Sequence, residues 1–327
     1  MTARRVLVCG GAGYIGSHMA KWLAKHGIEP TVLDNLSTGH RDAVRWGELI
    51  EADLLDTAAL DLAFAERPRF DAVMHFCARS LVGESVQKPY DYYLNNVTGT
   101  LNLLQAMQRH GMDRIVFSST AAVFGNPEAE RIDENHPKAP INPYGASKLM
   151  VERTLADAAT AYGLRSVTLR YFNAAGASPD GDIGERHDPE THLLPNLLRA
   201  TLGTAPPLKV FGNDWPTPDG TCVRDYVHVD DLAEAHLLAL GHMDKAPGAH
   251  AFNLGSGSGY SVKEAIAVAS RVTGREVPHE FAARRAGDPP TLVASSDLAR
   301  HTLGWQPAYG SLEAIIETAW RWHRGTA

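Results

Sequence analysis

The chain has 327 residues, of which 44% are hydrophobic and 21% charged, and its formal net charge is −7. This length and composition predict a globular protein of one large domain or two ordinary ones. The acidic balance and the lack of a basic run argue against a nucleic-acid partner. No apolar stretch is long enough to span a membrane. Because the 3 cysteines show no CxxC spacing and the 15 histidines no HExxH motif, we expect free thiols in the cytoplasm and no metal site.

In the first half of the chain, short β-branched runs alternate with longer stretches of helical periodicity. We expect strands at Val6–Val8, Thr31–Leu33, Ala72–Met74, Ile115–Phe117 and Val167–Leu169. We expect helices at Ser17–His26, Thr57–Arg67, Asn95–His110 and Tyr144–Tyr162. Strands that alternate with helices predict an α/β fold, in which a doubly wound parallel sheet of the Rossmann type has helices on both faces.

The second half of the chain has a different composition, because glycine and proline are frequent from Gly176 to Gly220. Helical patterns lie at residues 193–202, 229–241, 262–272 and 311–323. We predict a first domain over residues 1–173 and a smaller C-terminal α/β domain over residues 174–327 that binds the substrate. Part of the segment 227–253 is regular enough to return to the first domain.

A glycine pattern follows the first expected strand, where Gly10, Gly13 and Gly16 form GxxGxxG ahead of a helix. Gly10 permits a tight turn, Gly13 lets the backbone approach a pyrophosphate, and Gly16 allows close packing of helix and strand. The place of the pattern between a strand and a helix indicates a dinucleotide-binding loop. Asp34 ends the second expected strand, where a carboxylate accepts hydrogen bonds from ribose hydroxyls and repels a 2′-phosphate. NAD is therefore favoured over NADP.

Tyr144 and Lys148 form a YxxxK motif, whose i, i+4 spacing places both side chains on one face of a helix. With a pKa of about 10 in water, a tyrosine is a poor base at neutral pH. A nearby ammonium lowers that pKa, so the tyrosine can exchange a proton with a substrate hydroxyl while hydride passes to a nicotinamide. Alone, the motif also fits an exposed pair on a solvated helix.

The surroundings of this motif favour the catalytic interpretation. Ser118 and Thr120 lie at the carboxyl end of an expected strand, where ligands bind in open α/β sheets. Asn95 lies at the start of the expected helix before that strand. Its side chain either faces the cofactor or caps the helix.

With these motifs the chain resembles the extended short-chain dehydrogenase/reductase family and, within it, the UDP-glucose (UDP-galactose) 4-epimerases. The resemblance covers nearly the whole chain. The matching segments are GGAGYIGSH (10–18), LDNLSTG (33–39), VGESVQKPYDYYLNNVTGTLNLL (82–104), FSSTAAVFG (117–125), NPYGASKLMVE (142–152), LRYFNAAGA (169–177), GTCVRDYVHVDDLAEAH (220–236) and FNLGSGSGYSV (252–262).

The resemblance implies reversible 4-epimerisation of UDP-glucose and UDP-galactose through a transient 4-keto sugar, with NAD reduced and reoxidised in one turnover. Tyr144 would take the proton of the 4-hydroxyl, Lys148 would contact the nicotinamide ribose, and Thr120 would bridge substrate and tyrosine. Besides Tyr144 and Lys148, the implied cofactor-binding residues are Gly10, Gly13, Tyr14, Ile15, Gly16, Asp34, Asn35, Asp53, Leu54, Phe76, Cys77, Ala78, Asn95, Ser118 and Tyr171.

The resemblance also implies a UDP-sugar site in the second domain. Asn173 would reach the diphosphate, and Arg224 and Arg285 would bind phosphates as charged forks, although a surface ion pair is the plain alternative for either arginine. Asp288 would bind the uridine ribose, and two aromatic residues would line the uracil pocket. The implied substrate-binding residues are Thr120, Tyr144, Asn173, His192, Leu193, Phe211, Arg224, Tyr226, Arg285, Asp288 and Leu292.

Three positions depart from the pattern of the family. Ser80 stands where several of these epimerases carry a basic residue, with Arg79 adjacent, and His192 stands where some have an asparagine. Leu292 falls at a position whose size gates C2 substituents: aromatic residues there exclude N-acetyl groups and small residues admit them. A leucine is intermediate, so activity on N-acetylhexosamines stays open.

Other functions fit the same cofactor site. A 4,6-dehydratase is disfavoured, because alanines rather than acids follow Thr120. A 4-epimerase acting on UDP-N-acetylhexosamine, UDP-glucuronate or a UDP-pentose remains the alternative. A non-catalytic NAD sensor is less favoured, since it would not need the YxxxK pair. The resemblance implies a homodimer through the helices expected at Asn95–His110 and Tyr144–Tyr162.

Overall fold

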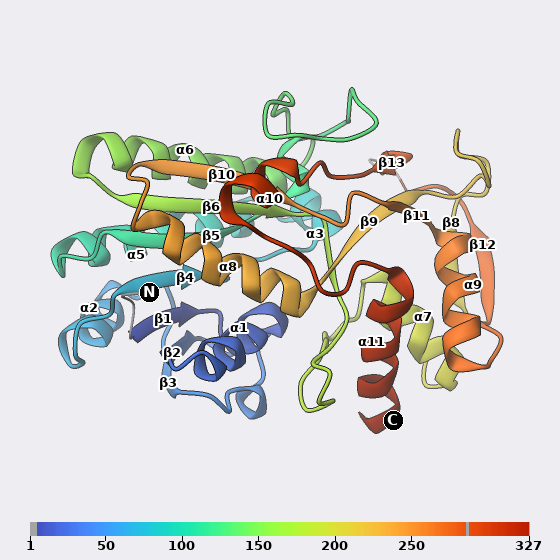
Figure 1. The fold of residues 1–327 in the computed structure, drawn as a ribbon, viewed down its shortest axis with the longest axis horizontal. Coiled ribbons are helices and arrows are strands. Elements are labelled where there is room, and N and C mark those ends of the chain that lie inside the picture. The colour runs from blue at the N-terminus through green and yellow to red at the C-terminus, as the bar shows by residue number, and fades with distance from the viewer. Residues whose placement is uncertain (1–4, 286–287, 327) are drawn as a thin grey trace.

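The computed structural model describes residues 5–285 and 288–326, so the outer ends of both expected domain ranges lie outside the described residues. A central sheet has seven strands in the order β10-β6-β5-β4-β1-β2-β3, and every neighbouring pair is parallel (Figure 1). Its strands are β1 Arg5–Cys9, β2 Glu29–Asp34, β3 Glu48–Glu51, β4 Ala72–His75, β5 Arg114–Thr120, β6 Arg165–Tyr171 and β10 Ala249–Leu254.

Helices cover both faces of this sheet, because apolar side chains point to both sides of a fully buried parallel strand. The α1 and α8 helices pack on one face, and α2, α5 and α6 pack on the other. The helices around the sheet are α1 Tyr14–Lys25, α2 Thr57–Ala65, α3 Val82–Gln87, α4 Pro89–Tyr92, α5 Gly99–Arg109, α6 Pro143–Tyr162, α8 Val229–Met243 and α10 Asp297–Leu303, with short turns at η1 Arg41–Ala43, η2 Tyr93–Thr98 and η3 Ala121–Val123. The predicted α/β fold class is confirmed.

A smaller unit packs at the carboxyl end of the central sheet, where its own apolar core joins three helices to short strands (Figure 1). The strand β9 pairs with β7, β11 and β13, while β8 pairs with β12. The elements of this unit are β7 Asn173–Ala175, α7 Leu193–Leu202, β8 Leu208–Phe211, β9 Val223–His228, β11 Gly259–Ser261, α9 Val262–Thr273, β12 His279–Ala282, β13 Thr291–Leu292 and α11 Leu312–Thr326.

Most expected elements are present, and the differences have local causes. The first helix begins at Tyr14 rather than Ser17, because Gly13 is already its extended N-cap. The helix expected from Asn95 begins earlier, at Pro89, and passes through the π-helical turn η2 that contains Asn95. A cap role for Asn95 is therefore wrong. Among the described helices, none combines the length and apolarity that a bilayer crossing requires.

A buried ion pair fastens α6 to the central sheet. Arg170 of β6 donates to Glu152 of α6 at 2.9 Å from Nε and 2.7 Å from Nη2, and these side chains are 5% and 8% exposed. Ser119 of β5 donates to the same carboxylate at 2.6 Å. The carboxylate of Glu152 therefore joins one helix to two adjacent strands.

We predict that Arg170→Met lowers the free energy of unfolding by about 3–5 kcal/mol, because it leaves the buried Glu152 carboxylate without its cation. Arg153→Met is the matched control, since Arg153 pairs with Asp157 on the same helix with side chains 79% and 63% exposed. Loss of that exposed pair should cost less than about 1 kcal/mol. Urea unfolding measures both variants, and equal losses would contradict the structural role of Arg170.

Candidate active site

The turn between β1 and α1 brings the predicted glycines against the end of β4. Gly10 has a φ of +82°, and a Cβ there would lie 2.8 Å from the amide nitrogen of Cys77. A Cβ on Gly16 would lie only 2.1 Å from the carbonyl oxygen of Gly10. Both glycines are therefore required for the tight turn, and the first amides of α1 open toward it as an anion-binding helix end.

The residues predicted for the adenosine half lie together beside this turn. The Asp34 carboxylate accepts the backbone N–H of Ala12 at 2.9 Å and of Leu36 at 2.8 Å, which fixes its direction. Burial raises the pKa of Asp34, and the two backbone hydrogen bonds oppose that rise. Asn35 donates to the carboxylate of Asp53 at 2.7 Å. The ends of β2 and β3 thus meet at one edge of the sheet, as parallel strands dictate.

The residues Phe76, Cys77 and Ala78 follow β4 directly. The amide of Phe76 donates to the carbonyl of Cys9 at 2.8 Å, which continues the ladder one residue past the end of β4. Burial raises the pKa of the Cys77 thiol, so this cysteine stays protonated and unreactive at neutral pH. The segment forms one wall of the glycine turn.

Lys148 lies buried where α6 crosses the end of β5. Asn142 caps α6 by accepting the amide of Gly145 at 2.8 Å, which sets the position of the helix start. The Lys148 ammonium is 3% exposed, donates to the carbonyl of Ser118 at 2.8 Å and lies 4.7 Å from the Phe117 ring centroid. Burial lowers the pKa of Lys148 to about 8. The buried amine therefore still carries its charge at pH 7, but it loses its proton more readily than an exposed lysine does.

Tyr144 lies one turn before Lys148 and contacts the end of the same strand. Burial raises the pKa of Tyr144, and its hydrogen bond with Thr120 opposes that rise. In this arrangement the Lys148 ammonium donates to the carbonyl of Ser118, and the expected lowering of the Tyr144 pKa by Lys148 stays a prediction. On the next strand, burial raises the pKa of Tyr171, while a hydrogen bond with Ser118 opposes it.

Asn96 organises this region, although sequence reasoning singled out its neighbour Asn95. The Asn96 side chain is 2% exposed, accepts the amide of Arg79 at 2.8 Å and donates to the carbonyl of Arg79 and to Ser147, both at 3.0 Å. Asn95 donates to the Asn96 side chain at 2.9 Å. The doubled asparagine was the available signal, but only the fold shows which of the two is buried.

In the smaller unit, Asn173 is held by β9, at a residue whose buried carboxylate the sequence did not single out. Asn173 donates to the carbonyl of Asp225 at 2.7 Å. The Asp225 side chain is fully buried and accepts the amides of Ser256 at 2.8 Å, Gly257 at 3.1 Å and Ala294 at 3.0 Å. Burial raises the pKa of Asp225 and these hydrogen bonds oppose it. The only signal in the sequence was an Asp between the arginine and tyrosine of VRDY.

The residues predicted for UDP come together as two pairs. A nitrogen of the Arg224 guanidinium lies 3.9 Å from the Asp288 carboxylate, and the Arg285 guanidinium lies 3.9 Å from the Phe211 ring centroid. Leu292 is the register partner of Arg224 across β13 and β9 and packs on the apolar cluster that follows Thr120. The last contact connects the smaller unit to the catalytic end of β5.

The other predicted substrate residues lie in different surroundings. Tyr226 and Leu193 belong to the core of the smaller unit, and Tyr226 also borders a cavity of about 490 Å³ that contains none of the other predicted residues. His192 is the N-cap residue of α7, and its Nδ1 contacts the Glu185 carboxylate. The substrate contacts of these three residues stay predictions.

Comparison with known proteins extends these similarities over nearly the whole chain. The model of the NAD dependent epimerase/dehydratase family matches residues 6–255. A curated UDP-glucose 4-epimerase of Streptococcus mutans serotype c is 52% identical over 320 residues, which are 97% of this chain and 96% of that protein. The solved UDP-glucose 4-epimerase of Brucella ovis in complex with NAD is 52% identical with a TM-score of 0.94, over 97% of this chain and 98% of that one. The solved enzyme of Bifidobacterium longum in complex with NAD+ and UDP is 36% identical with a TM-score of 0.94, over 98% of each chain.

We predict that Gly16→Ala abolishes the binding of NAD, because the new Cβ would overlap the carbonyl oxygen of Gly10 and force the turn open. Absorbance of nucleotide released from the denatured protein measures bound NAD. Gly241→Ala in α8 is the control, since a Cβ there meets nothing within 4 Å. That control should keep its NAD and gain up to about 1 kcal/mol of stability. A full complement of NAD in Gly16→Ala would contradict the proposed fit of the turn.

Proposed function

The chain belongs to the NAD dependent epimerase/dehydratase family, and from that premise we propose that it is an NAD-dependent UDP-glucose 4-epimerase. It interconverts UDP-glucose and UDP-galactose by inverting C4 of the hexose through a transient 4-keto sugar. The observation that carries this proposal is the convergence of Thr120, Tyr144 and Lys148 at the carboxyl end of β5, beside the glycine turn.

The residues around the turn fit NAD. Backbone atoms occupy the positions that side chains on Gly10 and Gly16 would need, so the turn is tight. The amides of α1 can therefore approach a pyrophosphate. The Asp34 carboxylate is fixed beside the turn, where it would accept ribose hydroxyls and repel a 2′-phosphate. Bound NAD would supply the hydride acceptor for C4 of the sugar and the hydride donor for the return step.

Tyr144 moves the proton in this reaction. As a phenolate, its oxygen takes the proton of the sugar 4-hydroxyl when C4 is oxidised, and the resulting tyrosine gives that proton back when C4 is reduced. Thr120 holds the Tyr144 hydroxyl through their hydrogen bond and bridges it to the substrate oxygen. Lys148 supplies a buried positive charge that stabilises negative charge developing on the oxygens at this end of β5.

The smaller unit binds the UDP half. Arg224 and Arg285 would provide forked donors for phosphate oxygens, and Asn173 of β7 donates to the carbonyl of Asp225, the residue after Arg224. Asp288 binds the ribose, and Phe211 lies under Arg285 where it can cover the uracil. Because the sugar site lies between this unit and β5, binding UDP positions C4 for reaction.

The other substrates are not favoured, since the relatives of about 50% identity carry the name UDP-glucose 4-epimerase. A solved UDP-Glc/GlcNAc 4-epimerase of Campylobacter jejuni is 42% identical, so N-acetylhexosamines are the alternative to include in a substrate panel. We place the enzyme in the cytoplasm, where reducing conditions keep Cys9, Cys77 and Cys222 as free thiols.

We predict that the purified protein, without added NAD, converts UDP-galactose to UDP-glucose, and that Tyr144→Phe lowers kcat by about 10²–10⁴-fold, the range that acid–base catalysis supplies. Bound NAD should be retained in the variant. Tyr162→Phe is the control, since Tyr162 ends the same helix and is 68% exposed. Absence of conversion by wild-type protein with NAD bound would overturn the epimerase proposal, and full turnover in Tyr144→Phe would remove Tyr144 as the base.

We further propose a homodimer formed through α5 and α6. Several large apolar side chains are exposed on these helices and on the turns before α5. Monomeric proteins rarely leave large apolar patches exposed, so this surface fits an interface. The exposed fractions are 63% at Val86, 85% at Tyr90, 52% at Leu94, 38% at Leu101 and 48% at Met150. Pairing of these helices across a two-fold axis would remove this surface from water.

We predict a dimeric mass for the wild-type protein in light scattering at micromolar concentration and a shift toward monomer in Met150→Glu, which places a charge inside the proposed interface. Leu298→Glu is the control, because Leu298 is 43% exposed on α10, which packs on α8 and β10. A monomeric wild-type protein, or an undisturbed dimer in Met150→Glu, would contradict this interface.

A further inference from the structure

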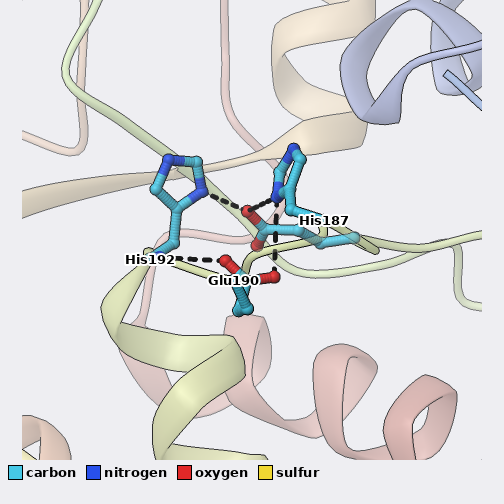
Figure 2. Close-up of side chains that lie close together, drawn as sticks. His187, Glu190 and His192 are labelled. Atoms are coloured by element: carbon cyan, nitrogen blue, oxygen red, sulfur yellow. Dashed lines mark hydrogen bonds and ion pairs between the residues drawn. The ribbon is translucent and has the colours of Figure 1, made fainter. Parts of the chain in front are cut away.

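The segment between β7 and α7 carries four side chains of the kinds that bind transition metals. Glu185, His187, Glu190 and His192 each offer one nitrogen or carboxylate oxygen, and these four atoms all lie within 4.8 Å of one another. Figure 2 shows His187, Glu190 and His192 turned toward one another from one short stretch of chain. No step of the proposed epimerisation uses this group of side chains as a unit.

Two carboxylates of the group are buried and held in place. The Glu185 side chain is 4% exposed, and the Glu190 side chain is 2% exposed. One oxygen of Glu190 accepts the amides of Thr191 at 2.8 Å and His192 at 2.9 Å, which leaves the other oxygen directed at His187. Two buried carboxylates side by side require compensating positive charge, because each loses its hydration.

The position of His187 does not suit ordinary hydrogen bonds. Its Nδ1 lies 3.4 Å from Glu185 Oε1 and 3.5 Å from Glu190 Oε2, and it has no hydrogen-bond partner among the described residues. Donor–acceptor distances in N–H···O bonds are about 2.7–3.2 Å. Ligands about 2.0–2.1 Å from a tetrahedral Zn²⁺ are themselves about 3.3–3.4 Å apart. These two separations match the edges of a metal-centred tetrahedron better than hydrogen bonds, whereas His192 Nδ1 is in direct contact with Glu185 Oε1 and would move away from it to admit an ion.

The buried carboxylates face both imidazoles, because Glu185 Oε1 contacts Nδ1 of His187 and Nδ1 of His192. A divalent cation bound among these atoms would balance the two carboxylate charges.

We propose that Glu185, His187, Glu190 and His192 bind one divalent transition-metal ion of the Zn²⁺ class. Two imidazole nitrogens and two carboxylate oxygens suit Zn²⁺, whereas Mg²⁺ and Ca²⁺ prefer oxygen ligands alone. Four protein ligands leave no open position in a tetrahedron, so the ion has a structural role.

The ion would fasten this segment to the start of α1. The rings of Tyr14 and His187 lie nearly perpendicular with 6.4 Å between their centroids, and the Tyr14 hydroxyl donates to the carbonyl of Gly176 at 2.7 Å. Trp322 of α11 donates to the carbonyl of Glu185 at 3.1 Å. The site therefore joins α1, α11 and the entry to α7. It also commits Nδ1 of His192 to the metal rather than to the substrate.

The direct test loads the full-length protein with Zn²⁺, removes excess metal by gel filtration and counts zinc per chain by mass spectrometry. We expect one zinc per chain and a rise in Tm on loading, because a ligand that binds the folded state stabilises it. Substitution with Co²⁺ should give the intense visible absorption of a tetrahedral site. Zinc well below one per chain would overturn the proposal, as would an octahedral cobalt spectrum.

Variants locate the ion. His187→Gln and Glu190→Gln should each weaken zinc binding by at least about tenfold, since loss of a residue that only supports a ligand already costs about that much. Competition with a chromophoric chelator measures the affinity. His187→Cys should retain zinc, since thiolate is a good ligand. His301→Gln is the control, because His301 is exposed on α10 and its Nδ1 bonds the carbonyl of Asp297 within the same helix. Unchanged affinity in both His187→Gln and Glu190→Gln would overturn the assignment, and Glu190→Gln decides alone if His187→Gln does not fold.

Discussion

The active-site end of the molecule depends on the hydrogen bond from the buried Lys148 ammonium to the carbonyl of Ser118. An ammonium that is buried away from water must find a hydrogen-bond acceptor. The acceptor here, the carbonyl of Ser118, lies close to the end of β5. The bond therefore fixes the register of α6 on the sheet. One turn later Glu152 faces the same strands and binds Arg170. With α6 held at both points, Tyr144 has one place to lie, beside Thr120.

The rest of the nucleotide site follows from the parallel sheet. Because every strand runs in the same direction, the loops after β1, β2, β4 and β5 all leave from one edge. The glycine turn, the Asp34 carboxylate and the segment after β4 meet at this edge. The order of the parallel strands brings them together, and no motif in the sequence links them. The same geometry places the chain after β6 at this edge, and that chain enters the smaller unit at β7.

Buried polar side chains connect the smaller unit to the sheet. Lys21 of α1 donates to Ser178 at 2.6 Å and to Asp182 at 2.7 Å across the boundary. The Asp231 carboxylate accepts the amides of Ala308 at 2.7 Å and Tyr309 at 3.1 Å. Such bonds have definite directions, whereas apolar contacts tolerate sliding, so they set how the residues proposed to bind UDP face β5. The four proposed metal ligands between β7 and α7 lie on the same boundary.

The sequence by itself determined the features that depend on residues close together in the chain. The β-branched runs, the GxxGxxG turn, the acid at Asp34 and the YxxxK pair all follow from local periodicity and spacing, and the fold class follows from their alternation. The structure confirms that fold class and places Tyr144 and Lys148 on one helix.

Only the tertiary structure decided which polar groups are buried and what they face. Whether Asn95 or Asn96 is enclosed, where Lys148 directs its charge, and why burial raises the pKa of Tyr144 all depend on segments distant in sequence. The cluster around Glu185 has no familiar metal-binding spacing, and a bent segment rather than a helix or strand gathers its side chains. Local spacing cannot report these features, because burial and charge are properties of the packed chain.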